Sequence, residues 1–330
     1  MQEGRFHIMQ REWLDPYMLD VKAVFESVEE RLRQYPDSLA EHALEQLRLL
    51  NPTFRRDSEH SSIGYITPLW MQYTDGLSPD QAHQLSTACL LHMMYFLNLD
   101  DVMDEPTEDA VLKLSLGNLC YMDAIQVYSA LFEPSSAFWN YFRQLLQDWA
   151  VSVNGELHVD FFQQNPLLIA QKASPSLLGA IGSLLLLRQT DRITSICAGL
   201  NIVLMTLQMT DDFTDTKQDA EHGNYNSYLS HISAALQQEY PTFPFNESTS
   251  HNVFNSQFMN SYADIAHHFN DILISSNDDL PQLVSLNSYL CKLLIQAIQE
   301  IQQRKKGLYR GGFHYWISES QSETATKGTS

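Results

Sequence analysis

The chain of 330 residues has few cysteines, and their spacing argues against two classes of cysteine-dependent site. The four cysteines are scattered at Cys89, Cys120, Cys197 and Cys291, so no Cys-x-x-Cys pair suggests zinc. A disulfide framework is not expected in a chain this long with so few cysteines. We expect the four thiols to be small core residues of a cytoplasmic protein.

Long hydrophobic runs are also missing from the sequence. The longest apolar stretches, such as residues 177–187, are shorter than the roughly 20 residues that cross a bilayer. Residues 1–7 lack the apolar core of a signal peptide. We therefore expect no integral membrane segment.

Basic side chains are scarce, because 20 lysines and arginines stand against 40 aspartates and glutamates, for a formal net charge of −20. Such a charge argues against nucleic acid or an anionic membrane surface as the main partner. An anionic substrate would have to rely on bound cations and a few local basic residues. The absence of an Asp-x-Asp-x-Asp-Gly loop and of a His-rich ligand set argues against a calcium-binding protein or a metal hydrolase.

What the sequence does contain is apolar periodicity of the helical kind along most of its length. It predicts helices over residues 17–35, 38–50, 79–99, 112–132, 137–162, 177–187, 193–209, 253–275 and 281–304, with a soft spot at 154–156, a break at 172–175 and a linker at 240–252. Arg188 and Arg192 are predicted to be helix-end charges in solvent. We expect one all-α domain, residues 1–316, and a polar, disordered tail, residues 317–330.

Carboxylates gather at the end of two of the apolar helices. Within residues 208–219, Asp211, Asp215 and Asp219 are four apart, so a helix would place them on one face. Like charges at this spacing repel each other, and a divalent cation would relieve the repulsion. Mg²⁺ suits such a site, because it is usually held by one or two carboxylates together with phosphates and water.

The other acidic cluster, residues 99–105, follows the apolar run 90–97. Asp100 and Asp104 are again four apart, and Asp101 lies beside them. One acidic cluster is more often a solvated helix end, but two of them, each attached to an apolar helix, favour a metal site. Two clusters that face each other could hold several Mg²⁺ ions around a diphosphate.

The Asp-Asp-x-x-Asp sequences at residues 100–104 and 211–215 resemble the two aspartate-rich motifs of the class I isoprenoid synthases. This all-α superfamily includes trans-prenyl diphosphate synthases and terpene cyclases. The likeness extends over about residues 60–230 and includes Gln208, three residues before the second motif. Lys172 resembles the family's diphosphate-binding lysine.

The resemblance implies a helical bundle with a central cavity, in which several Mg²⁺ ions, or Mn²⁺ in their place, bridge carboxylates to a substrate diphosphate. The implied metal ligands are Asp100, Asp104, Asp211, Asp215 and Asp219, and the implied catalytic residues are Asp100, Asp101, Asp104, Asp211 and Asp215. The implied substrate contacts are Lys172, Gln208, Tyr95, Phe96 and Arg310. Tyr95 and Phe96 match the positions that form the floor of the family's substrate pocket. Two bulky rings at these positions favour a prenyl chain of farnesyl size.

The chain departs from the chain-elongating members where they bind isopentenyl diphosphate. Their Gly-Gly-Lys-x-x-Arg-Pro pattern is replaced by residues 63–68, and their arginine pair after the first motif by residues 106–113. Arg55 and Arg56 could partly replace the missing charge, although a solvated basic pair is the commoner interpretation. The sequence therefore favours a terpene cyclase that acts on one allylic diphosphate, namely geranyl, farnesyl or geranylgeranyl diphosphate.

Two alternatives remain open at this point. One is a prenyltransferase or prenyl diphosphate synthase with a non-standard second-substrate site, since the second motif also fits those enzymes. The other is a non-catalytic subunit of a heteromeric prenyl synthase, which would have no need to keep Lys172 and both acidic clusters. The resemblance also allows a homodimer, because family members are commonly dimers.

Overall fold

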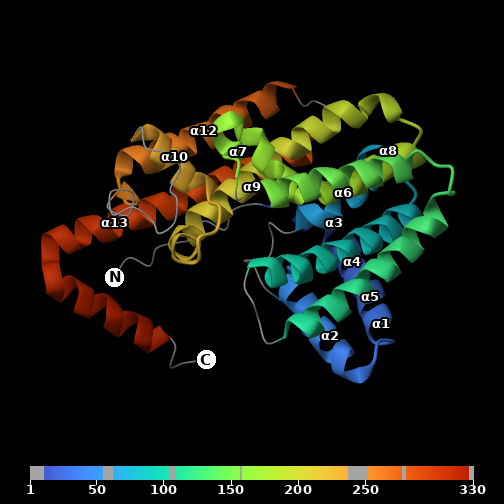
Figure 1. The fold of residues 1–330 in the computed structure, drawn as a ribbon, viewed down its shortest axis with the longest axis horizontal. Coiled ribbons are helices and arrows are strands. Elements are labelled where there is room, and N and C mark those ends of the chain that lie inside the picture. The colour runs from blue at the N-terminus through green and yellow to red at the C-terminus, as the bar shows by residue number, and fades with distance from the viewer. Residues whose placement is uncertain are drawn as a thin grey trace. The chain divides into compact units, whose positions relative to one another are not determined.

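The computed structural model describes residues 11–54, 62–104, 109–156, 158–236, 252–276 and 280–326, without the side chains of 104 and 309–326. Every regular element among these residues is a helix, so the predicted all-α class is confirmed (Figure 1). Arg55, Arg56 and most of the predicted linker, residues 240–251, lie outside the described residues.

Two compact units make up the chain. Unit 1 comprises Met1–Gln208 and Phe269–Leu290, and unit 2 comprises Met209–His268 and Cys291–Ser330. Three helices contribute residues to both units, namely α9 (Ile193–His222), α12 (Ser256–Ser276) and α13 (Pro281–Thr326). Neither unit is therefore a continuous stretch of chain, and the single domain over residues 1–316 stays a prediction.

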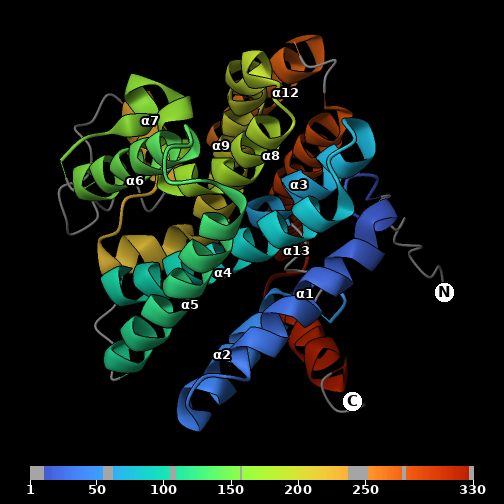
Figure 2. The same cartoon turned by 90° about the vertical axis from the view of Figure 1, so that its right-hand side faces the viewer.

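Unit 1 is built around helix α4, which packs against α1, α3, α5 and α8. Figures 1 and 2 show α4 and α5 side by side. The elements of unit 1 before α9 are η1 (Asp15–Tyr17), α1 (Met18–Leu32), α2 (Asp37–Leu50), α3 (Ile63–Thr74), α4 (Pro79–Asp104), α5 (Ala110–Leu131), α6 (Phe138–Gly155), α7 (Phe161–Gln164), η3 (Pro166–Leu177), α8 (Leu178–Leu186) and η4 (Thr190–Arg192). The first acidic cluster therefore ends the helix at the centre of this unit.

Helix α4 begins as its sequence predicts. The Ser78 hydroxyl accepts a hydrogen bond from the Gln81 amide at 3.3 Å, and Pro79 occupies the first helical position. The side chains that face the core are fully buried, among them Leu85, Ala88, Leu91 and Met94. Burial of this apolar stripe fixes the rotation of α4, and with it the direction of the turns that carry Asp100.

Helix α3, which contains residues 63–68, is a core helix. All residues from Ile63 to Met71 are buried. A Cβ atom added at Gly64 would lie 2.6 Å from Met93 Sδ of α4, and one added at Gly179 of α8 would lie 2.6 Å from Thr67 Oγ1. The absence of side chains at these two glycines lets α3, α4 and α8 approach closely.

The long helix predicted over residues 137–162 is two helices, α6 and α7, so this prediction is wrong. The predicted soft spot at residues 154–156 marks the break. A Cβ atom at Gly155 would lie 2.5 Å from Phe161 Cζ, because the Phe161 ring packs where a side chain would otherwise stand. The chain turns back at this point, and the turn depends on a tertiary contact that periodicity does not reveal.

Residues 166–177 form the 3₁₀ helix η3, with Pro175 inside it. The predicted break at residues 172–175 is not seen, because η3 runs through these residues and the α-helix begins at Leu178. Pro175 lacks the amide hydrogen that an α-helix needs, which agrees with the 3₁₀ form of this stretch. The Ser174 hydroxyl donates to the Leu145 carbonyl of α6 at 2.9 Å, which anchors η3 next to Lys172.

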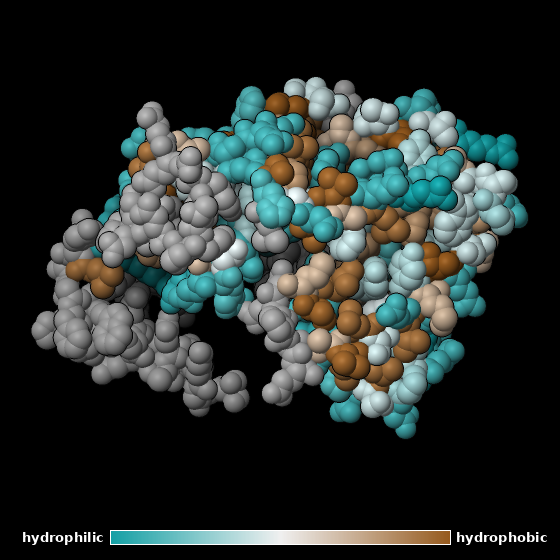
Figure 3. Space-filling model, viewed as in Figure 1, coloured by the Kyte–Doolittle hydropathy of each residue, from teal (hydrophilic) through white to brown (hydrophobic). Residues whose placement is uncertain are grey.

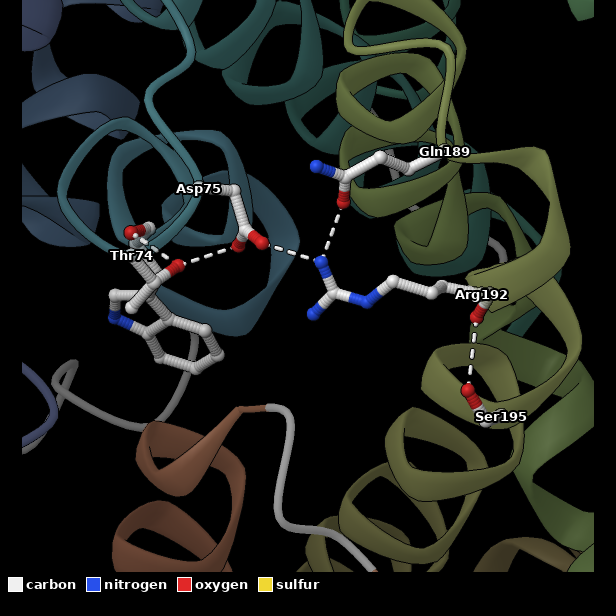
Figure 4. Close-up of polar contacts among 6 residues, drawn as sticks. Thr74, Asp75, Gln189, Arg192 and Ser195 are labelled. Carbon is white, nitrogen blue, oxygen red and sulfur yellow. Dashed lines mark hydrogen bonds and ion pairs between the residues drawn. The ribbon is translucent and has the colours of Figure 1, made fainter.

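An ion pair joins the end of α3 to η4. The Arg192 guanidinium contacts the Asp75 carboxylate, and the Thr74 hydroxyl donates to the same carboxylate at 2.6 Å (Figure 4). The two charged side chains are only 20% and 10% exposed. The prediction of a solvated charge is thus wrong for Arg192, because its partner lies 117 residues away in the sequence. Arg188 is exposed as predicted, with a left-handed φ of 60°.

The first described residues of the chain are tied to the beginning of α13. The Trp13 ring packs 5.6 Å from the Tyr289 ring, and Gln282 Nε2 donates to the Tyr17 hydroxyl at 2.7 Å. Trp70 Nε1 of α3 donates to the Trp13 carbonyl at 2.8 Å. The core of unit 1 therefore brings together residues as far as 265 positions apart in the sequence.

Apolar and polar side chains are interspersed on one face of unit 1 (Figure 3). The large exposed apolar side chains of unit 1 include Val111 and Met122 of α5, which are 78% and 57% exposed. Single exposed apolar residues of this kind are common on protein surfaces.

Unit 2 contains the acidic part of α9, helix α10 (Ser227–Ala235), the first part of α12 and most of α13. Its core includes Phe213, Tyr228 and Tyr262, and the Tyr228 ring lies 5.0 Å from each of the other two. The backbone of α13 is helical through Thr326, which differs from the tail predicted to be disordered from residue 317. Residues 318–326 are polar but contain no glycine or proline, so a helix can continue through them.

By length and composition alone, one helical stretch among the described residues could cross a membrane. It is Thr190–His222, whose most apolar window has a mean hydropathy of 1.5. This differs from the expectation from uninterrupted apolar runs, since polar residues are interspersed in α9. Of that window, 56% is buried inside the structure, as in the core helix of a soluble protein.

Candidate functional site

The second acidic cluster lies on the last turns of α9, in unit 2. Residues 193–222 form one continuous helix, so the predicted helical spacing of Asp211, Asp215 and Asp219 is confirmed. The side chains of Asp211 and Asp219 are half-buried, and that of Asp215 is exposed. We call these three residues the carboxylate ladder.

All three carboxylates of the ladder have raised pKa values. Burial raises the pKa of Asp211 to about 7, with a further contribution from the neighbouring carboxylates of Asp212 and Asp215. Partial desolvation also raises the pKa of Asp215, although its side chain is exposed. Burial raises the pKa of Asp219 to about 6, although a hydrogen bond from Asn226 lowers it. These shifts favour the protonated acids, an effect that a bound cation would reverse.

Asp212 points away from the ladder and binds helix α10. Its buried carboxylate accepts hydrogen bonds from the Ser227 amide at 2.8 Å and from the Ser227 hydroxyl. The Ser227 hydroxyl also lies 2.6 Å from the Tyr262 hydroxyl of α12. The two adjacent aspartates of the second motif therefore have different environments.

The first acidic cluster lies at the end of α4, in unit 1. Asp100 is half-buried, and the exposed Asp101 carboxylate lies 3.1 Å from Lys113 Nζ of α5. Lys113 Nζ is also 3.8 Å from the Asp109 carboxylate. Asp104 is the last residue of α4, and its side chain lies outside the described part. Asp101, predicted to be catalytic, thus shares a cationic partner with Asp109.

Lys172, the predicted diphosphate ligand, is paired with an acid. Its Nζ lies 2.8 Å from Glu156 Oε1 at the end of α6, and the two side chains are 31% and 15% exposed. A diphosphate that used Lys172 would have to compete with Glu156 for this ammonium group. Gln208 is half-buried in α9, and Arg310 falls within α13 with its side chain outside the described part.

Tyr95 and Phe96 of α4 belong to an aromatic cluster with side chains of α5 and α6. The cluster comprises His92, Tyr95, Phe96, Tyr121, Tyr128, Phe142 and Trp149. The Phe96 ring is 5.0 Å from the Trp149 ring, and the Tyr95 ring is 4.9 Å from the Tyr121 ring. Phe96 is buried and Tyr95 is half-buried.

His92 lies inside this aromatic cluster and was not singled out by its sequence. Its ring stacks on Phe142 at 5.4 Å and 8°, it is buried, and its Nε2 atom has no hydrogen-bond partner. Burial lowers the pKa of His92 to about 3, so the ring is neutral. The sequence feature that could have identified His92 is its spacing, because His92, Phe96 and Asp100 are four residues apart and so lie on one face of the helix.

The predicted site residues with described side chains fall in both units. Asp100, Asp101, Lys172, Gln208, Tyr95 and Phe96 belong to unit 1, and Asp211, Asp215 and Asp219 belong to unit 2. Within the described ranges, no group of three or more His, Cys, Asp or Glu side chains forms an all-protein metal cage. Mg²⁺ usually takes one or two carboxylates with phosphates and water, and the hard oxygen donors of the carboxylate ladder fit that donor set.

A groove of about 380 Å³ lies between α1, α4 and α5 in unit 1. Its polar lining includes Arg31, His83, Gln84 and Gln126. Next to it, His83 Nε2 lies 2.7 Å from the Asp20 carboxylate. None of the predicted site residues lines this groove.

A scan against protein-family models finds none that matches the chain, and no curated protein matches it significantly. The family interpretation therefore depends on the motif residues themselves.

Proposed function

We propose that the chain is a class I terpene synthase, a lyase that ionises one allylic prenyl diphosphate and releases diphosphate. Farnesyl diphosphate is favoured over the geranyl and geranylgeranyl compounds. The observation that carries this proposal is the carboxylate ladder on α9. Acids on successive turns of one helix, with raised pKa values, are suited to supply the one or two carboxylates that bind Mg²⁺ together with a phosphate.

In this proposal Mg²⁺, when bound, stabilises the negative charge of the departing diphosphate as a Lewis acid. In unit 2 the residues that would hold it are Asp211, Asp215 and Asp219. Asp100 and Asp104, which belong to unit 1, stay predicted metal ligands. Lys172 would exchange Glu156 for a phosphate oxygen and donate a charge-assisted hydrogen bond. These residues bind and orient the leaving group.

The aromatic cluster would act on the hydrocarbon part of the substrate. Aromatic faces attract positive charge and offer no nucleophile, and a packed apolar wall excludes the water that would quench an allyl cation. Tyr95, Tyr121 and Trp149 are half-buried and next to other rings, and Tyr95, the only one of the three that was predicted to contact substrate, is the first candidate for contact with the prenyl chain.

The buried core helix α3 supports a single-substrate reaction. A second diphosphate would need its own cationic contacts, and the stretch from Ile63 to Met71 is buried and contains no basic residue. This favours cyclisation or rearrangement of one substrate over its elongation with isopentenyl diphosphate.

The test is incubation of the purified chain with Mg²⁺ and geranyl, farnesyl or geranylgeranyl diphosphate, each with and without isopentenyl diphosphate. Mass spectrometry of the hexane-soluble and diphosphate fractions gives the result. We expect a hydrocarbon or terpene alcohol from a single allylic substrate. A longer diphosphate formed only with isopentenyl diphosphate would instead identify a prenyltransferase, and no diphosphate release from any substrate would refute both.

Two substitutions and one treatment connect this activity to the acidic clusters. We expect Asp100→Ala and Asp211→Ala each to abolish diphosphate release, and removal of divalent metal with EDTA to do the same. Asp264→Ala, which removes an exposed carboxylate of α12, is the matched control and should leave the rate unchanged. Full activity in Asp211→Ala would contradict the assigned role of the ladder.

A further inference from the structure

Asn226 is a fully buried amide that connects helix α10 to the carboxylate ladder on α9. Its Oδ1 atom accepts hydrogen bonds from the amides of Tyr228 and Leu229, both at 3.1 Å, and so caps the N-terminus of α10. Its Nδ2 atom donates to the Asp212 carbonyl at 2.6 Å and to Asp219 Oδ2 at 2.7 Å. One side chain therefore binds two helices at once.

The turn between the two helices also wraps around Asp219. The Asp219 carbonyl accepts hydrogen bonds from the amides of Gly223 at 2.8 Å and Asn224 at 3.0 Å. Gly223 has a φ of 86°, a left-handed conformation that ends the helix at this point. The Asn224 side chain donates a further hydrogen bond to the Asp219 carboxylate. Asp219 thus has two amide donors, and both come from this turn.

The Asn226 amide is itself held in place from the other side. Asp212, the residue whose carbonyl it contacts, binds Ser227 through its carboxylate, and Ser227 contacts Tyr262. A buried amide without its partners would lose hydrogen bonds that no solvent could replace. The orientation of the Asp219 carboxylate is therefore coupled to the docking of α10 on α9.

We propose that Asn226 is a positioning residue, which orients the Asp219 carboxylate and so sets the affinity of the carboxylate ladder for a divalent cation bound with a diphosphate group. This inference rests on the proposed function, because it counts Asp219 among the metal ligands. Partners that orient a ligating side chain typically change metal affinity by about 10–100-fold when they are removed.

The alternative role of Asn226 is that of a helix cap alone, and a change of capping residue separates the two. Asn226→Ser keeps the oxygen that caps α10, but its side chain is too short to donate to Asp219. Asn226→Thr, which replaces the amide by another common capping residue, is the second variant if the serine variant does not fold. Tyr228→Phe is the matched control, because it removes a hydrogen bond from α10 to the Val253 carbonyl without touching Asp219.

The experiment measures Mn²⁺ binding to the full chain in the presence of inorganic pyrophosphate, by calorimetry or electron paramagnetic resonance, with a thermal melt of each variant. We expect Asn226→Ser to weaken Mn²⁺ binding about 10–100-fold and Tyr228→Phe to leave it unchanged. In an Asp219→Asn background, Asn226→Ser should have no further effect on affinity, because its effect acts through Asp219.

Three results would overturn the proposal. The first is an unchanged Mn²⁺ affinity in a folded Asn226→Ser variant, whether or not the variant is destabilised. The second is an equal loss of affinity from Asn226→Ser with and without Asp219→Asn, and the third is no Mn²⁺ binding by the unmodified chain. A failure of the proposed function can be told apart from a failure of the positioning role. If Asn226→Ser weakens Mn²⁺ binding as expected but no allylic diphosphate reacts, the positioning role stands and the terpene synthase activity does not.

Discussion

At the scale of single residues, His92 combines a titratable ring with an apolar environment. Burial lowers its pKa from 6.5 to about 3, so the folded chain binds this proton far less readily than the unfolded chain. The contribution of the neutral ring to stability is therefore complete above pH 6.5, and it is lost progressively as the pH falls from 6.5 toward 3. Between pH 7 and pH 5 this residue alone accounts for a loss of about 2 kcal/mol in the free energy of unfolding.

Replacement of this ring by phenylalanine should remove that pH dependence. We expect the free energy of unfolding of His92→Phe to fall by about 2 kcal/mol less between pH 7 and pH 5 than that of the unmodified chain. Urea unfolding at the two pH values measures the difference. His42→Gln, a change at an exposed histidine of α2, is the control, and an equal fall in the two chains would contradict the assignment.

Residue patterns predict part of the candidate site. The spacing of Asp211, Asp215 and Asp219 is sufficient to predict their common face, because helical geometry alone determines it. The partners of Asn226 and Lys172 are not predictable in this way. A single asparagine before a helix predicts a cap, but its second contact, with Asp219, depends on the turn that follows α9.

At the scale of elements, the pair of Asp75 and Arg192 connects α3 with the start of the long helix α9. Removal of one partner leaves a poorly hydrated charge behind, so we expect Arg192→Ala to lower the free energy of unfolding by about 2–4 kcal/mol. Asp75→Asn combined with Arg192→Gln should lower it less, since no charge remains unpaired. Urea unfolding measures both changes.

An exposed pair provides the comparison. Arg33, the C-cap residue of α1, forms an ion pair with Glu29, and the two side chains are 62% and 42% exposed. We expect Arg33→Ala to change stability by less than about 1 kcal/mol, because solvent screens such a pair. Equal losses in Arg33→Ala and Arg192→Ala would show that burial of Asp75 does not matter.

Most helices of the chain are predictable because their local signals agree with the fold. Helices α1, α2 and α5 lie within a few residues of their predicted ranges, since apolar periodicity and turn residues determine where they start and stop. The break between α6 and α7 is different, because it requires the ring of Phe161 to pack on Gly155. A contact that forms only in the folded structure leaves no periodic pattern in the sequence.

At the scale of the whole molecule, the net charge of −20 should oppose the encounter with an anionic substrate. At saturating Mg²⁺ we therefore expect kcat/KM for the proposed allylic diphosphate substrate to rise a few-fold between about 0.01 M and about 0.15 M salt, as screening weakens the repulsion. Steady-state kinetics in two salts with different anions check that the effect is not specific to one ion. A steady fall with salt would mean that local basic groups such as Lys172 dominate the encounter.

The contact of Trp13 with Tyr289 has a consequence for how the protein is made. The ribosome synthesises the chain from the N-terminus, so Trp13 and Tyr17 emerge long before the residues of α13 that they contact in the folded structure. Unit 1 cannot finish folding until its last residues, up to Leu290, have been synthesised. During that interval the apolar faces of its early helices are available to chaperones, and truncation before Gln282 would leave even the N-terminal residues without their native core.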